Sequence, residues 1–375
     1  MNKVIVISDS FKGTLSSAAI AKIAETCIHE VYPHCQVIGF PVADGGEGTV
    51  DCFLKALGGS RVTCTVQGPW QTPVEASYAR IGETAVVEMA AAAGLPLAAP
   101  RLDPARTTTY GVGELIRHAV AHGATRLILG LGGSATNDGG CGAAAALGTR
   151  FFNAAGEAFC PVGATLPEIA RIDAAKTRAL LGDIQVEVMC DIDNPLCGPR
   201  GAAAVFGPQK GADDAMVQQL DRGLSHLARV LEQDLGASVT RLPGAGAAGG
   251  FGAGAAAFLG AALRPGIEVV LDLLQFSALL EGCDLVITGE GRIDGQSLGG
   301  KVPVGVARRA KEAGVPVAAI VGVVGPECEA VYDAGITAIF PTNREALPFS
   351  ALAARAAEDY RRTLRDLLRY TRAIT

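Results

Sequence analysis

Five loops rich in Gly, Asp, Ser and Asn are the most informative feature of this 375-residue chain. Each follows a short apolar run that predicts a β-strand. The loops cover residues 8–14, 41–48, 130–140, 191–198 and 289–297. In parallel α/β sheets, ligands bind at the loops that follow the carboxyl ends of the strands. One such loop is explained well enough as a turn, but five together indicate a shared ligand site.

The residue types in these loops favour phosphoryl-transfer chemistry. Glycines let backbone N–H groups close on phosphate oxygens. Carboxylates beside an anionic ligand are unfavourable unless a cation intervenes, so the Asp-rich loops suggest Mg²⁺, which prefers oxygen ligands and phosphates. Lys12, Arg292 and Lys301 supply positive charge, and a carboxylate can accept the proton of an attacking hydroxyl.

Each feature taken alone has an ordinary explanation. Asp44-Gly45-Gly46 reads as a turn, and Lys12 and Asp9 read as a surface lysine and a loop cap. The five histidines have no Ser or Cys motif beside them, which argues against a catalytic triad. The interpretation therefore depends on the co-occurrence of the loops at predicted strand ends.

Two stretches imitate familiar nucleotide motifs. Residues 295–302 match G-x4-G-K, but Val302 stands where a P-loop has Ser or Thr, and the stretch begins well after its strand. Residues 244–249 match G-x-G-x-x-G, but they follow Pro243 instead of a strand. Both are interpreted as chance matches, although Lys301 can still bind an anion.

The pattern of elements predicts two α/β domains. Strands at 3–8 and 37–40 alternate with helices at 17–32 and 49–57, and the same alternation returns after residue 284, which indicates a doubly wound parallel sheet. Between them, strands at 61–67, 74–81 and 84–89 follow one another without helices, which implies antiparallel pairing. We expect a discontinuous domain of residues 1–65 and 285–375, an inserted mixed α/β domain of residues 66–284, and a ligand cleft between the two.

Composition excludes several other classes. A net charge of −6 and the absence of a basic stripe argue against nucleic-acid binding. The 10 cysteines include no C-x-x-C pair, which argues against a zinc cluster and suits the reducing cytosol. No apolar run reaches the ~18 residues of a membrane span, and the chain begins with a strand-like run. We therefore predict a cytoplasmic protein without membrane or nucleic-acid partners; its oligomeric state is not predicted.

Read together, the loops closely resemble those of bacterial type 1 glycerate kinases (glycerate 2-kinases). The matching stretches are SDSFKG at 8–13, ADGGEG at 43–48, GGSATNDGG at 132–140, CDIDNPL at 190–196, FGPQKG at 206–211, GAAGG at 246–250 and TGEGRID at 288–294. The resemblance extends from residue 3 to beyond 340. It implies a flavodoxin-like domain interrupted by a second α/β domain, and ATP- and Mg²⁺-dependent phosphorylation of D-glycerate to 2-phospho-D-glycerate, with 3-phospho-D-glycerate as the alternative product.

The working hypothesis distributes the residues among four roles. The substrate set is Ser8, Asp9, Ser10, Asp44, Gly45, Gly46 and Glu47. The nucleotide set is Gly132, Gly133, Ser134, Asn137, Asp138, Gly249, Gly250, Glu290 and Lys301. Asp191 and Asp193 would hold Mg²⁺, and the catalytic set is Lys12, Asp191, Arg292 and Asp294. Lys12 or Arg292 would pair with the glycerate carboxylate, and Asp294 or Asp191 would take the hydroxyl proton.

Two functions from other classes were weighed against this one. An NAD-dependent hydroxy-acid oxidoreductase would need a dinucleotide fingerprint directly after a strand, and the sequence has no convincing one. A two-domain solute-binding protein would normally carry a secretion signal, and it would not need so many carboxylates at strand ends.

Overall fold

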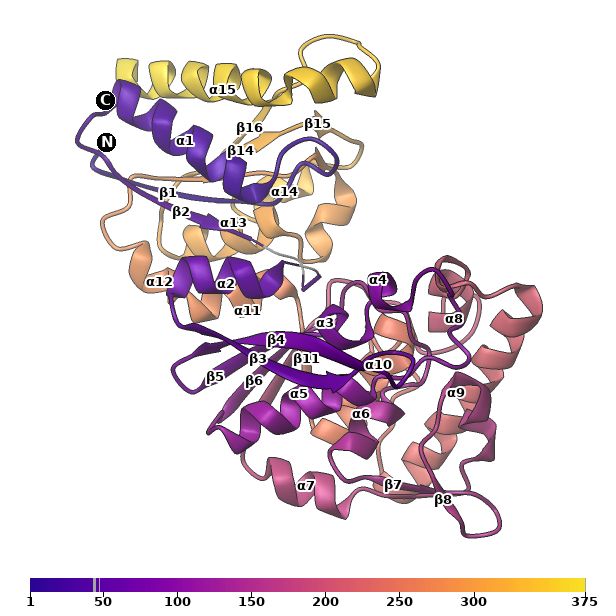
Figure 1. Ribbon diagram of the computed structural model, residues 1–375. Coiled ribbons are helices and arrows are strands. Elements are labelled where there is room, and N and C mark those ends of the chain that lie inside the picture. The colour runs from indigo at the N-terminus through magenta and orange to yellow at the C-terminus, as the bar shows by residue number, and fades with distance from the viewer. Residues whose placement is uncertain (43–44, 47, 375) are drawn as a thin grey trace. The chain divides into compact units, whose positions relative to one another are not determined.

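The computed structural model describes residues 1–42, 45–46 and 48–374. Their contacts divide the chain into two compact units, one made of Met1–Ala43 with Ile267–Thr375 and the other of Asp44–Gly266. Figure 1 shows the chain coloured from the N-terminus to the C-terminus. Each unit has its own sheet and its own apolar core.

The first unit is built on a five-stranded sheet in which all neighbours are parallel. Its order is β2-β1-β12-β14-β16. The strands are β1 (Lys3–Ser8), β2 (Gln36–Pro41), β12 (Leu285–Thr288), β14 (Val317–Val321) and β16 (Ala338–Pro341). The three central strands β1, β12 and β14 are almost wholly buried because the sheet is covered on both faces. A small pair, β13 (Arg292–Ile293) and β15 (Val323–Val324), continues β12 and β14.

Helices on both faces bury this sheet. On one side, α1 (Ser17–Val31) and α15 (Phe349–Ile374) pack on each other and on alternate strand residues such as Val4, Val6 and Ile287. On the other side lies α13 (Val302–Glu312), which contacts β1, β12 and β14. The remaining helical segments are α11 (Gly266–Leu273), α12 (Phe276–Leu279), η3 (Gly295–Gly299) and α14 (Ala330–Asp333). All five sheet strands therefore end on one edge, where the loops rich in Gly and Asp begin.

The second unit has a mixed six-stranded sheet of order β11-β10-β6-β5-β4-β3. The strands are β3 (Ser60–Gln67), β4 (Pro73–Ile81), β5 (Thr84–Glu88), β6 (Arg126–Gly130), β10 (Gln185–Met189) and β11 (Ala262–Arg264). β3, β4 and β5 form the expected antiparallel meander, and β5, β6, β10 and β11 run parallel. A separate three-stranded sheet contains β7 (Arg150–Phe152), β8 (Ala158–Phe159) and β9 (Arg171–Asp173).

The helices of the second unit surround a large core rich in Ala. They are α2 (Thr49–Leu57), α3 (Ala90–Ala93), α4 (Leu95–Ala98), α5 (Tyr110–Ala121), α6 (Cys141–Ala146), η1 (Gly163–Glu168), α7 (Ala175–Leu181), α8 (Ala202–Phe206), η2 (Pro208–Lys210), α9 (Asp214–Leu235) and α10 (Ala247–Leu259). Small residues permit close approaches here; a Cβ on Gly113 of α5 would lie 2.2 Å from the Ala143 carbonyl oxygen of α6.

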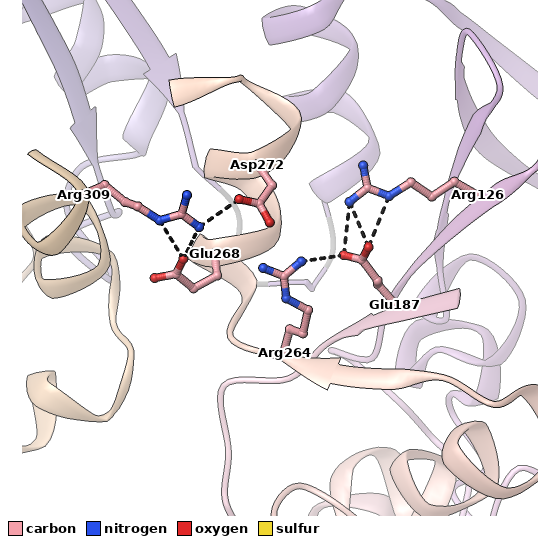
Figure 2. Close-up of polar contacts among 6 residues, drawn as sticks. All are labelled: Arg126, Glu187, Arg264, Glu268, Asp272 and Arg309. Atoms are coloured by element: carbon pink, nitrogen blue, oxygen red, sulfur yellow. Dashed lines mark hydrogen bonds and ion pairs between the residues drawn. The ribbon is translucent and has the colours of Figure 1, made fainter. Parts of the chain in front are cut away.

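In each unit, one charged side chain that binds two partners of opposite charge connects neighbouring elements (Figure 2). In the second unit, Glu187 on β10 accepts hydrogen bonds from Arg126 on β6 and Arg264 on β11 at 2.9 and 3.0 Å. In the first unit, Arg309 of α13 donates to Glu268 and Asp272 of α11 at 2.6 and 2.8 Å. The first set ties three neighbouring strands together, and the second fixes α11 against α13.

The structure agrees with the predicted combination of a parallel sheet and a separate mixed sheet. The contacts divide the chain at 43/44 and 266/267, and the expected domain boundaries at 65/66 and 284/285 stay a prediction. β3 pairs along its whole length with β4, so it shares the sheet of the second unit, and α2 packs on β4 and β5. Among the described residues, no helix combines the length and apolar character needed to cross a bilayer. All ten cysteines are free thiols.

Candidate functional site

Two of the predicted loops lie backbone to backbone in the second unit. The amide of Gly132 donates to the carbonyl of Gly45 at 3.0 Å. A Cβ on Gly132 would lie 2.4 Å from the Cα of Gly46, and a Cβ on Gly130 would lie 2.4 Å from the carbonyl oxygen of Gly45. The glycines are therefore required by the close approach of two backbones, and the loops after β6 and before α2 form one surface.

A third predicted loop packs against residues 136–139. The amide of Gly139 donates to the carbonyl of Gly249 at 3.1 Å, and a Cβ on Gly249 would lie 2.0 Å from the carbonyl oxygen of Thr136. Ala248, Gly249 and Gly250 all have positive φ within the first turn of α10. This conformation is unfavourable for Ala248, so the surrounding packing must hold it. The two loops assigned to the nucleotide are thus brought together.

The carboxylate of Asp138 is directed into the loop itself. Its oxygens accept from the amide and hydroxyl of Thr109, both at 2.8 Å, and from the amides of Gly140 and Gly142 at 3.1 and 3.3 Å. Burial raises the pKa of Asp138, and these bonds oppose that effect. The contacts favour a supporting role within the loop over the direct nucleotide contact predicted for Asp138.

The neighbouring Asn137 is the opposite case. It is fully buried, and neither its Oδ1 nor its Nδ2 has a hydrogen-bond partner in the described part of the chain. An unpaired buried polar group costs ~1–3 kcal/mol, so such a group in a loop of this kind indicates a ligand contact. This observation supports the predicted nucleotide-binding role of Asn137.

Sequence reasoning assigned no role to Lys210. Its side chain is buried, and its ammonium donates to the Oγ of Ser134 at 3.1 Å and to the carbonyl of Thr136 at 2.7 Å. Burial lowers its pKa to about 7, although the charge of Asp138 acts in the opposite direction. The only sequence signal was its place in the Gly207-Pro208-Gln209-Lys210-Gly211 stretch, where a lysine between two glycines reads as exposed.

The predicted magnesium ligands follow β10. Asp191 Oδ1 accepts from the amide of Gly266 at 2.7 Å. Asp193 is exposed and bonded by Arg200 at 2.9 and 3.1 Å. Among the described residues, no three His, Cys, Asp or Glu side chains gather as a metal cluster. One or two carboxylates suffice for Mg²⁺ that arrives on nucleotide phosphates, so the donor set fits that ion, Asp191 better than Asp193.

In the first unit, Ser8 is the last residue of β1, and the loop that follows carries Asp9, Ser10 and Lys12. The amide of Asp9 donates to the carbonyl of Gly289 at 2.9 Å, which joins this loop to the one after β12. Asp9 Oδ1 accepts from the amide of Ser10 at 2.6 Å. Lys12 is exposed. The structure thus brings Asp9 and the 289–297 loop together at one edge of the sheet, as predicted.

Glu290 is the buried carboxylate of this edge. Its Oε1 accepts from the hydroxyl of Ser297 at 2.6 Å, and its Oε2 pairs with Lys301 at 3.1 Å. Burial raises the pKa of Glu290, while Ser297 and Lys301 lower it and Asp9 raises it further. Lys301 therefore has a fixed position, and its side chain is still 40% exposed, so it can reach an anion.

Arg292 and Asp294 are bound to each other. The Nε of Arg292 donates to Asp294 Oδ2 at 3.0 Å, and Asp294 Oδ1 accepts from the amide of Gln296 at 3.1 Å. Asp294 thereby caps η3, so the stretch that imitates a P-loop is a short 3₁₀ helix. Both oxygens of Asp294 therefore have partners within this loop. The predicted substrate residues Asp44 and Glu47 lie outside the described residues.

Comparison with known proteins bears on the whole chain. A model of the glycerate kinase family matches residues 4–372. The chain is 49% identical to a glycerate kinase of Bacillus cereus and 46% identical to a glycerate 2-kinase of Escherichia coli, each over 341 residues and 90% of both chains. A crystal structure assigned to glycerate kinase 2 of Salmonella typhimurium LT2 superposes with a TM-score of 0.85 at 42% identity, covering 99% of this chain and 98% of the other.

Proposed function

Since the chain belongs to the glycerate kinase family, we propose that it transfers the terminal phosphoryl group of ATP to the 2-hydroxyl of D-glycerate. The chain is a glycerate kinase, and its substrates are glycerate and ATP. The finer statement, that the product is 2-phospho-D-glycerate, is supported by the Escherichia coli relative, which bears the name glycerate 2-kinase. Transfer to the 3-hydroxyl is the alternative.

The contact of the 132–140 loop with Gly45, Gly46 and Gly249 carries the proposal. The glycines let these loop backbones approach one another with no side chain between them, and the same lack of side chains permits close approach to a phosphate. The buried carboxamide of Asn137 adds a polar group that lacks a partner among the described residues. Gly132, Gly133, Ser134, Asn137, Gly249 and Gly250 are accordingly proposed to bind the triphosphate, and Asp138 to support them.

The acceptor is proposed to bind at Ser8, Asp9, Ser10, Asp44, Gly45, Gly46 and Glu47. Its carboxylate would pair with Lys12 in preference to Arg292, because the guanidinium of Arg292 already binds Asp294. Glu290 is proposed to hold Lys301, whose ammonium would reach the nucleotide phosphates. The proposal thus assigns a cation to each anionic substrate.

The reaction itself needs few groups. The acceptor oxygen bonds to the γ-phosphorus while the bond to the β,γ-bridging oxygen breaks, ADP leaves with that electron pair, and the hydroxyl proton passes to a carboxylate. Asp191 or Asp294 is the proposed proton acceptor. Mg²⁺ bound with ATP would neutralise phosphate charge. Asp191 would hold this ion, joined by Asp193 once Arg200 releases it.

The strand order of the first unit supports the expected flavodoxin-like description. Numbered by their order within that unit, its strands run 2-1-3-4-5, and every neighbour is parallel. The mixed sheet is built from the segment between β2 and β12, in keeping with an inserted second domain. A location in the reducing cytosol stays part of the proposal and is supported by the free thiols.

A coupled ADP-release assay tests the proposal. We expect ADP release that depends on D-glycerate, ATP and Mg²⁺, and none with glycerol, which lacks the carboxylate. Asp191→Asn should abolish turnover with the fold intact, while Asp193→Asn should raise the Mg²⁺ concentration needed for half-maximal rate. ADP release that does not depend on glycerate would overturn the proposal. A change in nicotinamide absorbance on adding glycerate would instead support the oxidoreductase alternative.

A further inference from the structure

Lys210 is unusual because its charge is buried without a carboxylate bonded to it. The side chain is 2% exposed, and its ammonium donates to the neutral Ser134 hydroxyl and to the Thr136 carbonyl oxygen. No ion pair of the described residues includes Lys210. Burying a charge in this way is costly unless neighbouring groups compensate, so packing alone does not account for a lysine here.

The ammonium of Lys210 closes the turn formed by residues 134–136. Ser134 Oγ lies 3.3 Å from the Thr136 Oγ1 and accepts from the Thr136 amide at 3.3 Å, and Lys210 joins this hydroxyl to the Thr136 carbonyl. Lys210 reaches the turn from η2, 74 residues further along the chain. The turn is therefore held from outside, because its own hydrogen bonds are long.

Asn137 lies between two fixed residues. The carbonyl of Thr136 is bound by Lys210, and the carboxylate of Asp138 is bound by Thr109, Gly140 and Gly142. The backbone of Gly249 covers the other side, close to the Cα of Asn137. Asn137 nevertheless has no partner for either polar atom within the described residues. A carboxamide held so firmly, and left unpaired, is organised for a ligand.

We infer that Lys210 is a positioning residue of the nucleotide site, which holds the 134–136 turn so that the Asn137 carboxamide hydrogen-bonds a phosphate oxygen of ATP. The inference rests on the proposed function, because the loop is assigned to ATP there. Lys210, when protonated, places a positive charge beside this loop that favours an anionic ligand, and such a ligand in turn favours the protonated form. Lys210 acts through Asn137 and the loop, and it need not touch the nucleotide.

Lys210→Met tests the inference because it keeps an unbranched side chain and removes the charge. Isothermal titration with ADP should show an affinity at least ~10-fold below that of the unsubstituted protein, since hydrogen bonds to charged groups are each worth about a factor of ten or more. KM for ATP should rise correspondingly, and KM for D-glycerate should stay within about twofold. A merely structural role would not separate the two substrates in this way. Lys176→Met, on the exposed face of α7, is the matched control.

Two further variants keep the inference testable if Lys210→Met does not fold. Ser134→Ala removes one acceptor of the ammonium and should weaken ADP binding in the same direction. Asn137→Ala should weaken it as strongly as Lys210→Met, and the double variant should bind no more weakly than either one, because both act through one contact. The inference would be overturned if the affinity losses of the two single variants multiplied in the double variant. A folded Lys210→Met protein with unchanged ADP affinity would also overturn it. If the unsubstituted protein itself fails to bind ADP, the proposed function is what has failed.

Discussion

Replacing Asp138 with asparagine tests whether this residue supports the loop or touches the nucleotide. The carboxylate is buried and accepts five hydrogen bonds of 2.8–3.5 Å, four at Oδ2 and one, from Gly140, at Oδ1. An asparagine has one acceptor oxygen. If that oxygen accepts hydrogen bonds from Thr109 and Gly142, the NH₂ group of the asparagine faces the N–H of Gly140. These two donors, the NH₂ group and the Gly140 N–H, are then left unpaired.

The magnitude follows from these two donors. Each unpaired buried donor costs ~1–3 kcal/mol. Burial disfavours the charged carboxylate and so raises the pKa of Asp138. A neutral asparagine avoids this penalty, and the gain offsets part of the cost of the two unpaired donors. We therefore expect a net loss of about 2–4 kcal/mol in the free energy of unfolding. For a unit of this size that is roughly 4–16 °C in Tm.

Differential scanning calorimetry with ADP titration separates the two roles. Asp138→Asn should lower Tm, while the exposed Asp183→Asn should leave it unchanged. Saturating ADP should still raise the Tm of the Asp138→Asn protein, because the ligand contact belongs to Asn137. A Tm equal to that of Asp183→Asn, together with lost ADP binding, would refute this reasoning and restore the direct contact predicted from the sequence.

Three further outcomes are expected. Gly132→Ala should reduce kcat/KM at least ~10-fold and destabilise the fold by ~1–3 kcal/mol, because its Cβ would lie 2.4 Å from the Gly46 Cα. Gly299→Ala is the control and should have neither effect, because its Cβ would meet nothing within 4 Å. Equal effects of the two substitutions would contradict the packing argument. Glu290 retains its proton in the folded chain above its ordinary pKa of 4.5 because burial raises that pKa; stability should thus fall as pH rises from about 4.5, and urea titrations of Glu290→Gln should lack this slope. Lys210, whose pKa is lowered from 10.5 to about 7, is neutral when folded but charged when unfolded between these values. Stability should therefore rise with pH across that window, and an identical slope in Lys210→Met would count against it.

Which loops follow the strands and carry the candidate site residues was largely predictable from sequence, because strand runs and loop composition are local signals. The loops of residues 130–140 and 246–250 were assigned together and do pack together, through Gly139 and Gly249. The direction of individual side chains was not predictable. Asp138 turns into its own loop and Asn137 stays unpaired, although the two are adjacent and equally polar. A loop has no periodicity from which to read which side chain faces inward.

Two other features depend on contacts distant in sequence. Lys210 is buried because the 134–136 turn supplies its acceptors, and nothing within residues 206–211 indicates that turn. β3 belongs with the second unit because β4 pairs with it, although β3 follows the N-terminal βαβα alternation without a break in composition. The division of the contacts at 43/44 follows such pairing, and the expected domain boundary at 65/66 stays a prediction.

Proton-coupled phosphorus NMR of the reaction product tests the central claim most directly. The purified chain would be incubated with ATP, Mg²⁺ and D-glycerate. A new phosphate ester resonance split into a doublet is predicted, because phosphorus on the 2-hydroxyl couples to the one proton at that carbon. A triplet would place the phosphate on the 3-hydroxyl and contradict the proposed product, and the absence of any new ester resonance would contradict the proposed function itself.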